Sequence, residues 1–260
     1  MGLRGILARA KEEYIYFTKR PWSLRSVGEF WDTVEDYDDI NSQIYPYFRR
    51  FSNSKKLLDL SGFRYDGSKN VLDIQARSGQ GTLYWSKILR NSKFFCVDFS
   101  NGLLEKAKNR LIGVKSVRYR IVDDEEFSFD EKFDLILCYE TIEHVFYYKK
   151  FLASLRKSMH SETYIILTCP NILWEPVHWL SYIIGINHSE GPHRFLRKKA
   201  LLDAFRENEL KVVSYNSTIL LPFNSKFSIR LDSWLEKNLP EYLRSFLMLR
   251  RSFILKCESQ

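Results

Sequence analysis

Two stretches of the sequence carry residues whose types and spacing could do chemistry. The first, VLDIQARSGQGT at residues 71–82, is an apolar run followed by a loop with Gly79 and Gly81. Glycine permits positive φ and close backbone approach, and a helix that begins near Thr82 would offer free N–H groups to a carboxylate or phosphate. The stretch therefore predicts a loop that holds part of a nucleotide-like ligand.

The second stretch is CYETIEHV, residues 138–145. Glu140 and Glu143, three residues apart on the opening turn of an expected helix, can face the same side. With His144, and with His193 of GPHRFL as a further ligand, they could hold Mg²⁺ or Mn²⁺, which would lower the pKa of a substrate hydroxyl. In the alternative, Glu143 and His144 are helix-start residues packed beside a bound cofactor, and His144 or His193 acts as a general base without metal.

Acidic residues follow the next two apolar runs. Asp98 ends FFCVD, 19 residues beyond Gly79, a spacing at which a carboxylate can accept hydrogen bonds from both hydroxyls of a ribose. Asp123 or Asp124, in VRYRIVDDEEFSF, could accept the exocyclic amine of adenine. A solvated acidic turn is the alternative for this pair.

Short apolar runs alternating with amphipathic segments must position these residues. The pattern predicts a doubly wound α/β fold with a mainly parallel sheet, helices on both faces and ligands at the carboxyl ends of the strands. We expect strands at 70–74, 93–98, 117–122, 133–138, 163–168, 210–217 and 251–257, and helices at 80–90, 101–111, 142–159, 173–185, 197–208 and 225–238.

The chain divides into two predicted parts. Residues 1–66 have helical spacing and many aromatic residues, and they predict an N-terminal helical cap of two or three helices. Residues 67–260 form the α/β domain, and the apolar stretch at about 172–192 is expected to be a lid, a lipid-facing patch or ordinary core.

In order and spacing, these segments, with YIILTCPN after them, resemble the class I S-adenosylmethionine-dependent methyltransferase family over residues 70–213. The resemblance implies a Rossmann-like, seven-stranded sheet whose last strand, SFILKCE, is antiparallel. It implies that Asp73 and the loop contact the methionine end of S-adenosylmethionine, Asp98 its ribose, and Asp123 with Asp124 its adenine. The expected cofactor-binding set is Asp73, Gln75, Arg77, Gly79, Asp98, Phe99, Asp123, Asp124 and Tyr139.

The loop departs from the family at two positions. Gln75 and Arg77 stand where the family pattern has glycine, close to the methionine moiety. If a position there demands positive φ, a side chain costs roughly 1–2 kcal/mol. Arg77 either turns outward or pairs with the cofactor carboxylate; otherwise it occupies the pocket.

Composition limits the partners and the compartment. The net charge of +8 favours anionic partners such as RNA, phosphorylated metabolites or an anionic membrane surface. Four cysteines without a CxxC pair fit reduced, buried thiols, and no signal peptide or membrane span is visible, so we expect a cytoplasmic, or membrane-peripheral, protein. The oligomeric state is not predicted.

The function predicted from these features is O-methylation of a small-molecule, glycan or lipid-linked acceptor. Glu140, Glu143, His144 and His193 are the candidate catalytic residues. The ExxEH motif and later histidine also resemble two metal-using branches of the family, the ubiquinone-pathway O-methyltransferases and the small-RNA 2′-O-methyltransferases. An RNA 2′-O-methyltransferase with a divalent metal is therefore one alternative. A non-catalytic binding protein with a degenerate cofactor loop is the other.

Overall fold

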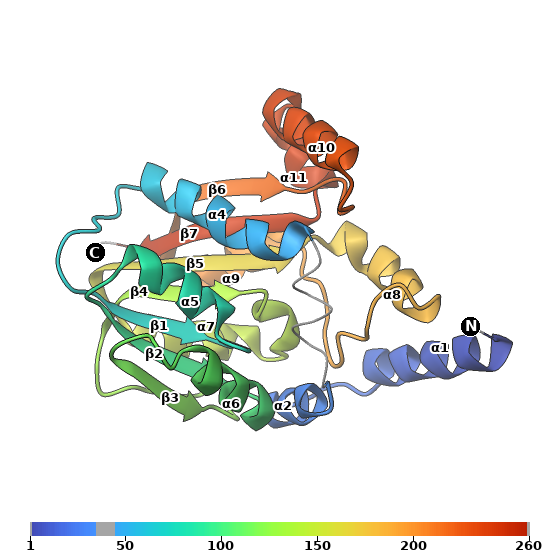
Figure 1. The fold of residues 1–260 in the computed structure, drawn as a ribbon, viewed down its shortest axis with the longest axis horizontal. Coiled ribbons are helices and arrows are strands. Elements are labelled where there is room, and N and C mark those ends of the chain that lie inside the picture. Colours follow the sequence, from blue (N-terminus) through green and yellow to red (C-terminus); the bar gives the residue numbers. More distant parts are fainter. Residues whose placement is uncertain (1, 35–44, 259–260) are drawn as a thin grey trace.

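A computed structural model describes residues 2–34 and 45–258 of the chain (Figure 1). A seven-stranded sheet lies at its centre, with strand order β3-β2-β1-β4-β5-β7-β6. β7 is antiparallel to both of its neighbours, and the remaining pairs are parallel. The strands are β1 Asn70–Ile74, β2 Lys93–Asp98, β3 Val117–Ile121, β4 Phe133–Tyr139, β5 Met159–Pro170, β6 Leu210–Thr218 and β7 Arg250–Cys257. The predicted doubly wound sheet with an antiparallel last strand is thus confirmed.

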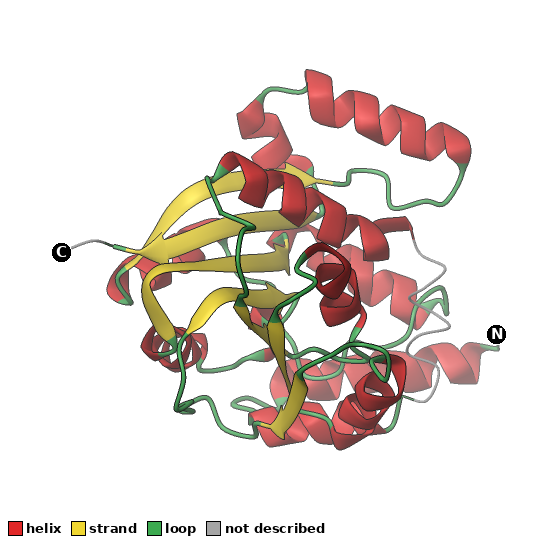
Figure 2. Ribbon diagram, turned by 60° about the vertical axis from the view of Figure 1, so that its left-hand side comes forward, coloured by secondary structure: helices red, strands yellow, loops and turns green. Residues whose placement is uncertain are grey.

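Helices cover both faces of the sheet, as Figures 1 and 2 show. Apolar side chains of α4 and α5 pack on one face, and those of α7 and α9 on the other. The central strands are therefore buried on both sides, which explains their continuous apolar runs. The helices are α1 Leu3–Thr18, α2 Leu24–Asp32, α4 Tyr45–Leu60, α5 Gln80–Ile88, α6 Asn101–Arg110, α7 Tyr148–Lys157, α8 Glu175–Ile183, α9 Lys198–Glu207, α10 Lys226–Asn238 and α11 Glu241–Leu247, with short 3₁₀ helices η1 Ile142–His144 and η2 Ile172–Trp174.

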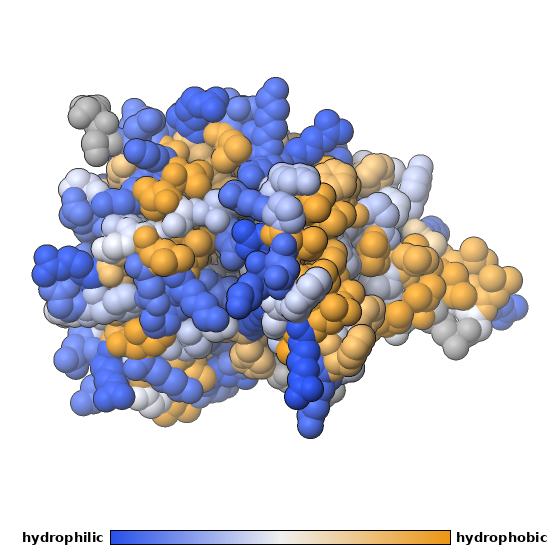
Figure 3. Space-filling model, turned by 90° about the horizontal axis from the view of Figure 1, so that it is seen from above, coloured by the Kyte–Doolittle hydropathy of each residue, from blue (hydrophilic) through white to orange (hydrophobic). Residues whose placement is uncertain are grey.

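The N-terminal helices make separate contacts with the sheet domain. α2 packs beside α6, whereas α1 extends away from the sheet and lies along α8 (Figure 1). Arg9 donates to the carbonyl of Tyr182 at 2.9 Å, and the Tyr182 hydroxyl donates to Glu12. Apolar side chains gather over this end of the molecule (Figure 3). Part of the predicted cap, residues 35–44, lies outside the described residues.

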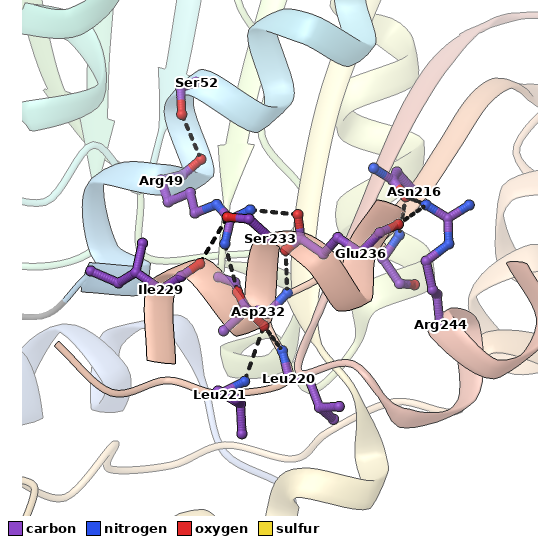
Figure 4. A network of polar contacts seen from close by, with 12 residues as sticks. Arg49, Ser52, Asn216, Leu220, Leu221, Ile229, Asp232, Ser233, Glu236 and Arg244 are labelled. Carbon is purple, nitrogen blue, oxygen red and sulfur yellow. Dashed lines mark hydrogen bonds and ion pairs between the residues drawn. The ribbon is translucent and has the colours of Figure 1, made fainter. Parts of the chain in front are cut away.

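A buried ion-pair network fixes the C-terminal helices to α4 (Figure 4). Arg49 of α4 donates to Asp232 at 2.6 Å and also to Glu236, both on α10. Asp232 also accepts hydrogen bonds from the backbone N–H groups of Leu220 and Leu221, which follow β6. The position of α10 is thereby tied to both α4 and the sheet.

Two expectations for the elements are wrong in detail. The helix predicted over 142–159 is divided into η1 and α7, because the chain turns at residues 145–147 before α7 begins. The segment 173–185 likewise starts as η2 and continues as α8. Within the described chain, no helix is long and apolar enough to cross a membrane.

Candidate functional site

The loop after β1 keeps the backbone shape of a glycine loop without all of its glycines. Gln75 and Arg77 have φ of 56° and 54°, and Gly79 has φ of 80°. A methyl group added at Gly81 would come within 3.0 Å of the Asp73 carboxylate, which explains the glycine there. The loop therefore retains its form, and the substitutions matter through their side chains.

The side chain of Arg77 crosses the crevice at the switch point of the sheet. β1 and β4 are neighbours there, and their following connections lead to opposite sides. The Arg77 guanidinium, which follows β1, donates to the carbonyl oxygen of Glu140 after β4 at 2.6 Å. It also lies over the Trp31 ring of α2, 5.7 Å from the centroid. Arg77 is only 8% exposed, so the alternative in which its side chain turns outward is wrong.

Gln75 is buried beside it and has no hydrogen-bond partner in the described chain. Both its Oε1 and Nε2 atoms are inaccessible and unpaired. A buried amide without partners costs about 1–3 kcal/mol, which favours a ligand that supplies both a donor and an acceptor. An amino acid carries an ammonium and a carboxylate, so the methionine end of S-adenosylmethionine would fit this position.

Asp73 and Asp98 are two buried carboxyl groups below the loop. Asp73 accepts a hydrogen bond from the Thr82 hydroxyl at 2.7 Å. Asp98 accepts from the backbone N–H groups of Arg77 at 2.6 Å and of Phe99 and Ser100 at 2.8 and 2.9 Å. Burial outweighs these hydrogen bonds and raises the pKa of each carboxyl to about 6. Asp98 thus lies at the end of β2, as the apolar run FFCVD predicts, and its carboxylate orders the loop. Its contact with the ribose stays a prediction.

Helix α2 covers the site beyond Asp98. Gly28 lies so close to the loop after β2 that an added methyl group would be 1.9 Å from the Phe99 carbonyl oxygen. Arg25 of the same helix pairs with Asp123 at 2.8 Å on the surface. Asp124 is exposed and accepts from the backbone of Glu126. The adenine role of the two aspartates stays a prediction.

The prediction that Glu140 and Glu143 share the opening turn of a helix is wrong, because Glu140 lies before the start of η1. Glu140 has φ of 50°, and its carboxylate forms a two-point ion pair with Arg250 of β7. Arg50 of α4 adds a second cation at 3.5 Å. Burial opposes the charge, but the two arginines more than offset it and lower the pKa of Glu140 to about 2.

Glu143, His144 and His193 lie close together beneath α1 and α2. Burial and the charge of Glu140 raise the pKa of Glu143 well above its usual value. Burial also lowers the pKa of His144 to about 3, and its Nδ1 lies 3.2 Å from the Pro192 carbonyl. Nδ1 of His193 lies 2.8 Å from the Gly191 carbonyl, and the two imidazole rings are 6.3 Å apart.

The predicted metal site is not assembled. No group of three or more His, Cys, Asp or Glu side chains in residues 2–34 and 45–258 is arranged to hold a metal ion. Glu140, the first predicted ligand, is committed to Arg250 and Arg50. The set of Glu140, Glu143, His144 and His193 therefore divides into an ion pair and a buried cluster.

Several residues of the site were not predicted. Trp31 contacts both the Arg77 guanidinium and the His144 ring. The ring centroids of Trp31 and His144 are 5.7 Å apart. Oε2 of Glu190 lies 3.8 Å from Nε2 of His144. Burial raises the pKa of Glu190, but the nearby histidines more than offset this effect and lower that pKa to about 2. The stretch NHSEGPH, with two histidines around one glutamate, was the available signal for Glu190. No pattern in the sequence indicates that Arg250 belongs to the site, because only the folded sheet brings β7 beside Glu140.

Buried Tyr139 points away from this cluster. Its hydroxyl accepts from Trp85 at 2.9 Å, and it belongs to the core on the α4 and α5 face. Phe99 is buried in the opposite core. Their expected cofactor contacts stay predictions.

Comparisons with known proteins bear on the chemistry of this site. A family model described as a methyltransferase domain matches residues 72–165. A search of curated proteins finds no match. The fold resembles the plantazolicin methyltransferase BpumL in complex with SAH (19% identity, TM-score 0.60, covering 97% of this chain and 99% of that chain).

Two further structures have the same fold. One is an S-adenosylmethionine-dependent methyltransferase from Clostridium acetobutylicum ATCC 824 (14% identity, TM-score 0.57, 82% and 92% covered). The other is the [4+2]-cyclase SpnF (12% identity, TM-score 0.63, 91% and 96% covered). At these identities the likeness concerns the fold alone, and the domain match adds a resemblance in sequence over residues 72–165. Residues 72–165 match a methyltransferase domain, and the chain has the fold of S-adenosylmethionine-dependent methyltransferases.

Proposed function

We propose that this enzyme transfers the methyl group of S-adenosylmethionine to a hydroxyl oxygen of a small-molecule, glycan or lipid-linked acceptor. The observation that carries the proposal is a buried histidine with a free acceptor nitrogen at the carboxyl edge of the sheet. A carbonyl oxygen can only accept, so the contact with Gly191 places the proton of His193 on Nδ1. Its Nε2 then carries a lone pair, and this atom has no hydrogen-bond partner in the described chain.

His193 is better suited than His144 to accept the proton of the hydroxyl. The low pKa of His144 keeps its ring neutral and makes it a weak base. When bound, S-adenosylmethionine would supply an electrophilic methyl carbon to the acceptor oxygen, and the electron pair of the broken carbon–sulfur bond would stay on sulfur. His193 would take the released proton on Nε2. Burial of the cluster beneath α1 and α2 would exclude water from the reaction.

The donor would be held by the loop after β1 and by Asp98. The Gln75 amide would meet the methionine moiety, and Asp98 would accept from the ribose. Arg77 or α2 must first shift, because the guanidinium lies between Trp31 of α2 and the Glu140 carbonyl at the ends of β1 and β4. This closed crevice is also what favours the second candidate, a binding protein that keeps the fold without catalysis. The RNA alternative was favoured by the net charge and by the metal site, and the metal site is not assembled among the described residues.

Methyl-transfer assays with labelled donor and a panel of hydroxyl acceptors test the proposal. We expect His193→Gln to lower kcat by about 10²–10⁴-fold while leaving the dissociation constant of S-adenosylhomocysteine unchanged. His160→Gln, a histidine at the start of β5 paired with Asp134, is the matched control and should keep full turnover. Turnover by His193→Gln at the parent rate contradicts the base assignment. Binding of S-adenosylhomocysteine without transfer to any acceptor supports the non-catalytic candidate.

A further inference from the structure

A cavity of about 830 Å³ lies at the carboxyl end of β5, apart from the Arg77 crevice. This volume is within the range of small-molecule sites in proteins, about 300–1,000 Å³. Residues from η2, the start of α9, α11 and β7 form its walls. The lining residues are Asn171, Ile172, Leu173, Arg197, Lys198, Glu241, Tyr242, Ser245, Phe246 and Arg251.

The cavity carries three cations that no carboxylate neutralises. Arg251 is 5% exposed and donates to two neutral oxygens, the Leu196 carbonyl at 2.9 Å and Asn171 Oδ1 at 2.6 Å. Its buried Nε has no partner in the described chain. Lys198 donates to the Ser245 hydroxyl at 3.0 Å and lies over the Tyr215 ring at 3.7 Å. Within residues 2–34 and 45–258, the exposed Arg197 side chain has no hydrogen bond or ion pair.

The start of α9 adds to the positive potential. Arg197 is the N-cap residue of this ten-residue helix, and no side chain caps it. Free N–H groups and the helix dipole favour an anion at such a position. Glu241 is the single carboxylate in the wall. The local charge therefore favours a ligand with an anionic group.

The rest of the wall is apolar and open to solvent. Leu173, Tyr242 and Phe246 are 45%, 72% and 59% exposed, which is unusual for side chains of this size around one cavity. Leu173 belongs to η2, which leads directly into α8 and its exposed Val177 and Leu180. A ligand with an anionic head and an apolar tail matches both halves of this surface.

Asn171 makes the cavity a built site. It is fully buried, and its Nδ2 donates to the carbonyls of Phe246 and Met248 at 2.7 and 3.0 Å. Its Oδ1 accepts from Arg251. One side chain thus fixes both the buried cation and the end of α11. The Arg49 network holds α10, and Arg244 of α11 donates to the Glu236 carbonyl at 3.0 Å (Figure 4).

The cavity adjoins the proposed catalytic edge through two consecutive arginines. Arg250 and Arg251 pair with Pro170 and Cys169 at the end of β5, and neighbouring strand residues point to opposite faces. Arg250 reaches Glu140 beside the crevice, and Arg251 reaches the cavity. A ligand in the cavity therefore lies one strand away from the residues that follow β4.

We infer that this cavity binds the methyl acceptor as an anionic amphiphile, with its phosphate or carboxylate on Arg197, Lys198 and Arg251 and its apolar chain on Leu173, Tyr242 and Phe246. The acceptor role rests on the proposed function, whereas the binding site stands without it. The anionic group is the anchor, and a hydroxyl elsewhere in the same molecule is the acceptor.

Calorimetric titration with decyl phosphate, below its micelle concentration, tests the site. We expect the parent chain to bind it, inorganic phosphate to bind at least tenfold more weakly, and decyl maltoside, which is neutral, to bind at least tenfold more weakly. The double variant Arg197→Ala/Lys198→Ala and the variant Phe246→Ala should each lose at least tenfold in affinity. Lys199→Ala removes an exposed cation next to Lys198 that does not line the cavity, and it should bind like the parent.

The outcomes separate failure of the site from failure of the proposed function. Equal affinity for decyl maltoside, or an equal effect of Lys199→Ala and the double variant, would overturn the inference, as would an absence of decyl phosphate binding at millimolar concentration. An equal affinity for inorganic phosphate would show an anion site without a chain site and would also overturn it. S-adenosylhomocysteine titration of the double variant should match that of the parent, so a lost donor site is recognised separately. Inhibition of methyl transfer by decyl phosphate in the parent, lost in the double variant, supports the acceptor role.

Discussion

Three non-glycine residues with positive φ surround the crevice: Gln75, Arg77 and Glu140. Each costs roughly 1–2 kcal/mol relative to a glycine in the same conformation. Such backbone conformations persist only where the surroundings fix them, and they concentrate at functional sites. Here the Asp98 carboxylate holds the N–H of Arg77, and Arg250 holds the side chain of Glu140. The strained backbone is therefore maintained by the same charged groups that define the site.

Arg77→Gly is expected to raise the affinity for S-adenosylhomocysteine at least about tenfold, equivalent to about 1.4 kcal/mol. The substitution removes the guanidinium from the crevice between Trp31 and the Glu140 carbonyl, and glycine adopts φ of 54° without strain. Isothermal titration calorimetry measures the change. Arg77→Lys, which keeps a cation at the position, is the control and should bind like the parent.

A loss of affinity in Arg77→Gly would contradict this expectation. It would show that the guanidinium pairs with the carboxylate of the donor once it leaves the Glu140 carbonyl. That outcome would also explain why this chain has an arginine in place of glycine.

The sequence located the carboxylates of the site better than their partners. Asp73 and Asp98 could be placed because each ends an apolar strand in a parallel sheet, where the carboxyl ends share one edge. The direction of the Arg77 side chain and the pairing of Glu140 with Arg250 could not be predicted. The first depends on a contact between residues that are 63 positions apart in the chain, and the second on a contact over 110 positions.

At the scale of elements, α2 decides access to the donor site. Its contact with the loop after β2 leaves no room for a side chain at Gly28. α2 also contributes Trp31, which is 2% exposed and covers Arg77. Opening of the crevice therefore requires α2 to move as a unit or Arg77 to leave.

Gly28→Ala is expected to lift α2 from the loop, because its methyl group would meet the Phe99 carbonyl at 1.9 Å. Hydrogen exchange of the α2 amides should then increase by at least tenfold, and S-adenosylhomocysteine should associate faster. Gly113→Ala is the matched control, since an added methyl group there meets no atom within 4 Å. Unchanged exchange in Gly28→Ala would show that α2 is not the cover of the site.

The sequence predicted the elements of the sheet domain closely, and the reason is their burial. Apolar runs such as 70–74 and 93–98 coincide with β1 and β2, because parallel strands covered on both faces read as short apolar segments. The helix expected over 142–159 is interrupted, since the buried Glu143 and His144 occupy a 3₁₀ turn that links the sheet to the loop at Arg194. α11, only seven residues long, gave no recognisable period and was missed.

At the scale of the whole molecule, buried carboxyl groups determine how stability depends on pH. Asp73, Asp98 and Glu143 have raised pKa values, so the folded state binds more protons than the unfolded state between about pH 4 and 6 or above. The free energy of unfolding contributed by these groups falls as pH rises through that range. Glu140 and Glu190, with pKa values of about 2, act in the opposite sense and lose their contribution as pH falls below about 4.5. We therefore expect the ligand-free protein to be most stable on the acid side of neutrality.

Glu143→Gln isolates one of these contributions. Glu143 is 4% exposed, and its Oε2 has no hydrogen-bond partner in the chain as described, so its ionisation in the folded state is costly. Because its pKa is raised, the cost is absent below the ordinary pKa of a glutamate, where the group is protonated in both states, and it grows as pH rises from there until the group ionises in the folded state. The neutral glutamine avoids it, and the variant should have a higher urea midpoint than the parent at pH 8, with a smaller difference at pH 6. Glu126→Gln, an exposed carboxylate paired with Lys150, is the control and should show no such dependence. Parallel pH profiles for Glu143→Gln and the parent would show that Glu143 is not protonated in the folded protein near neutrality.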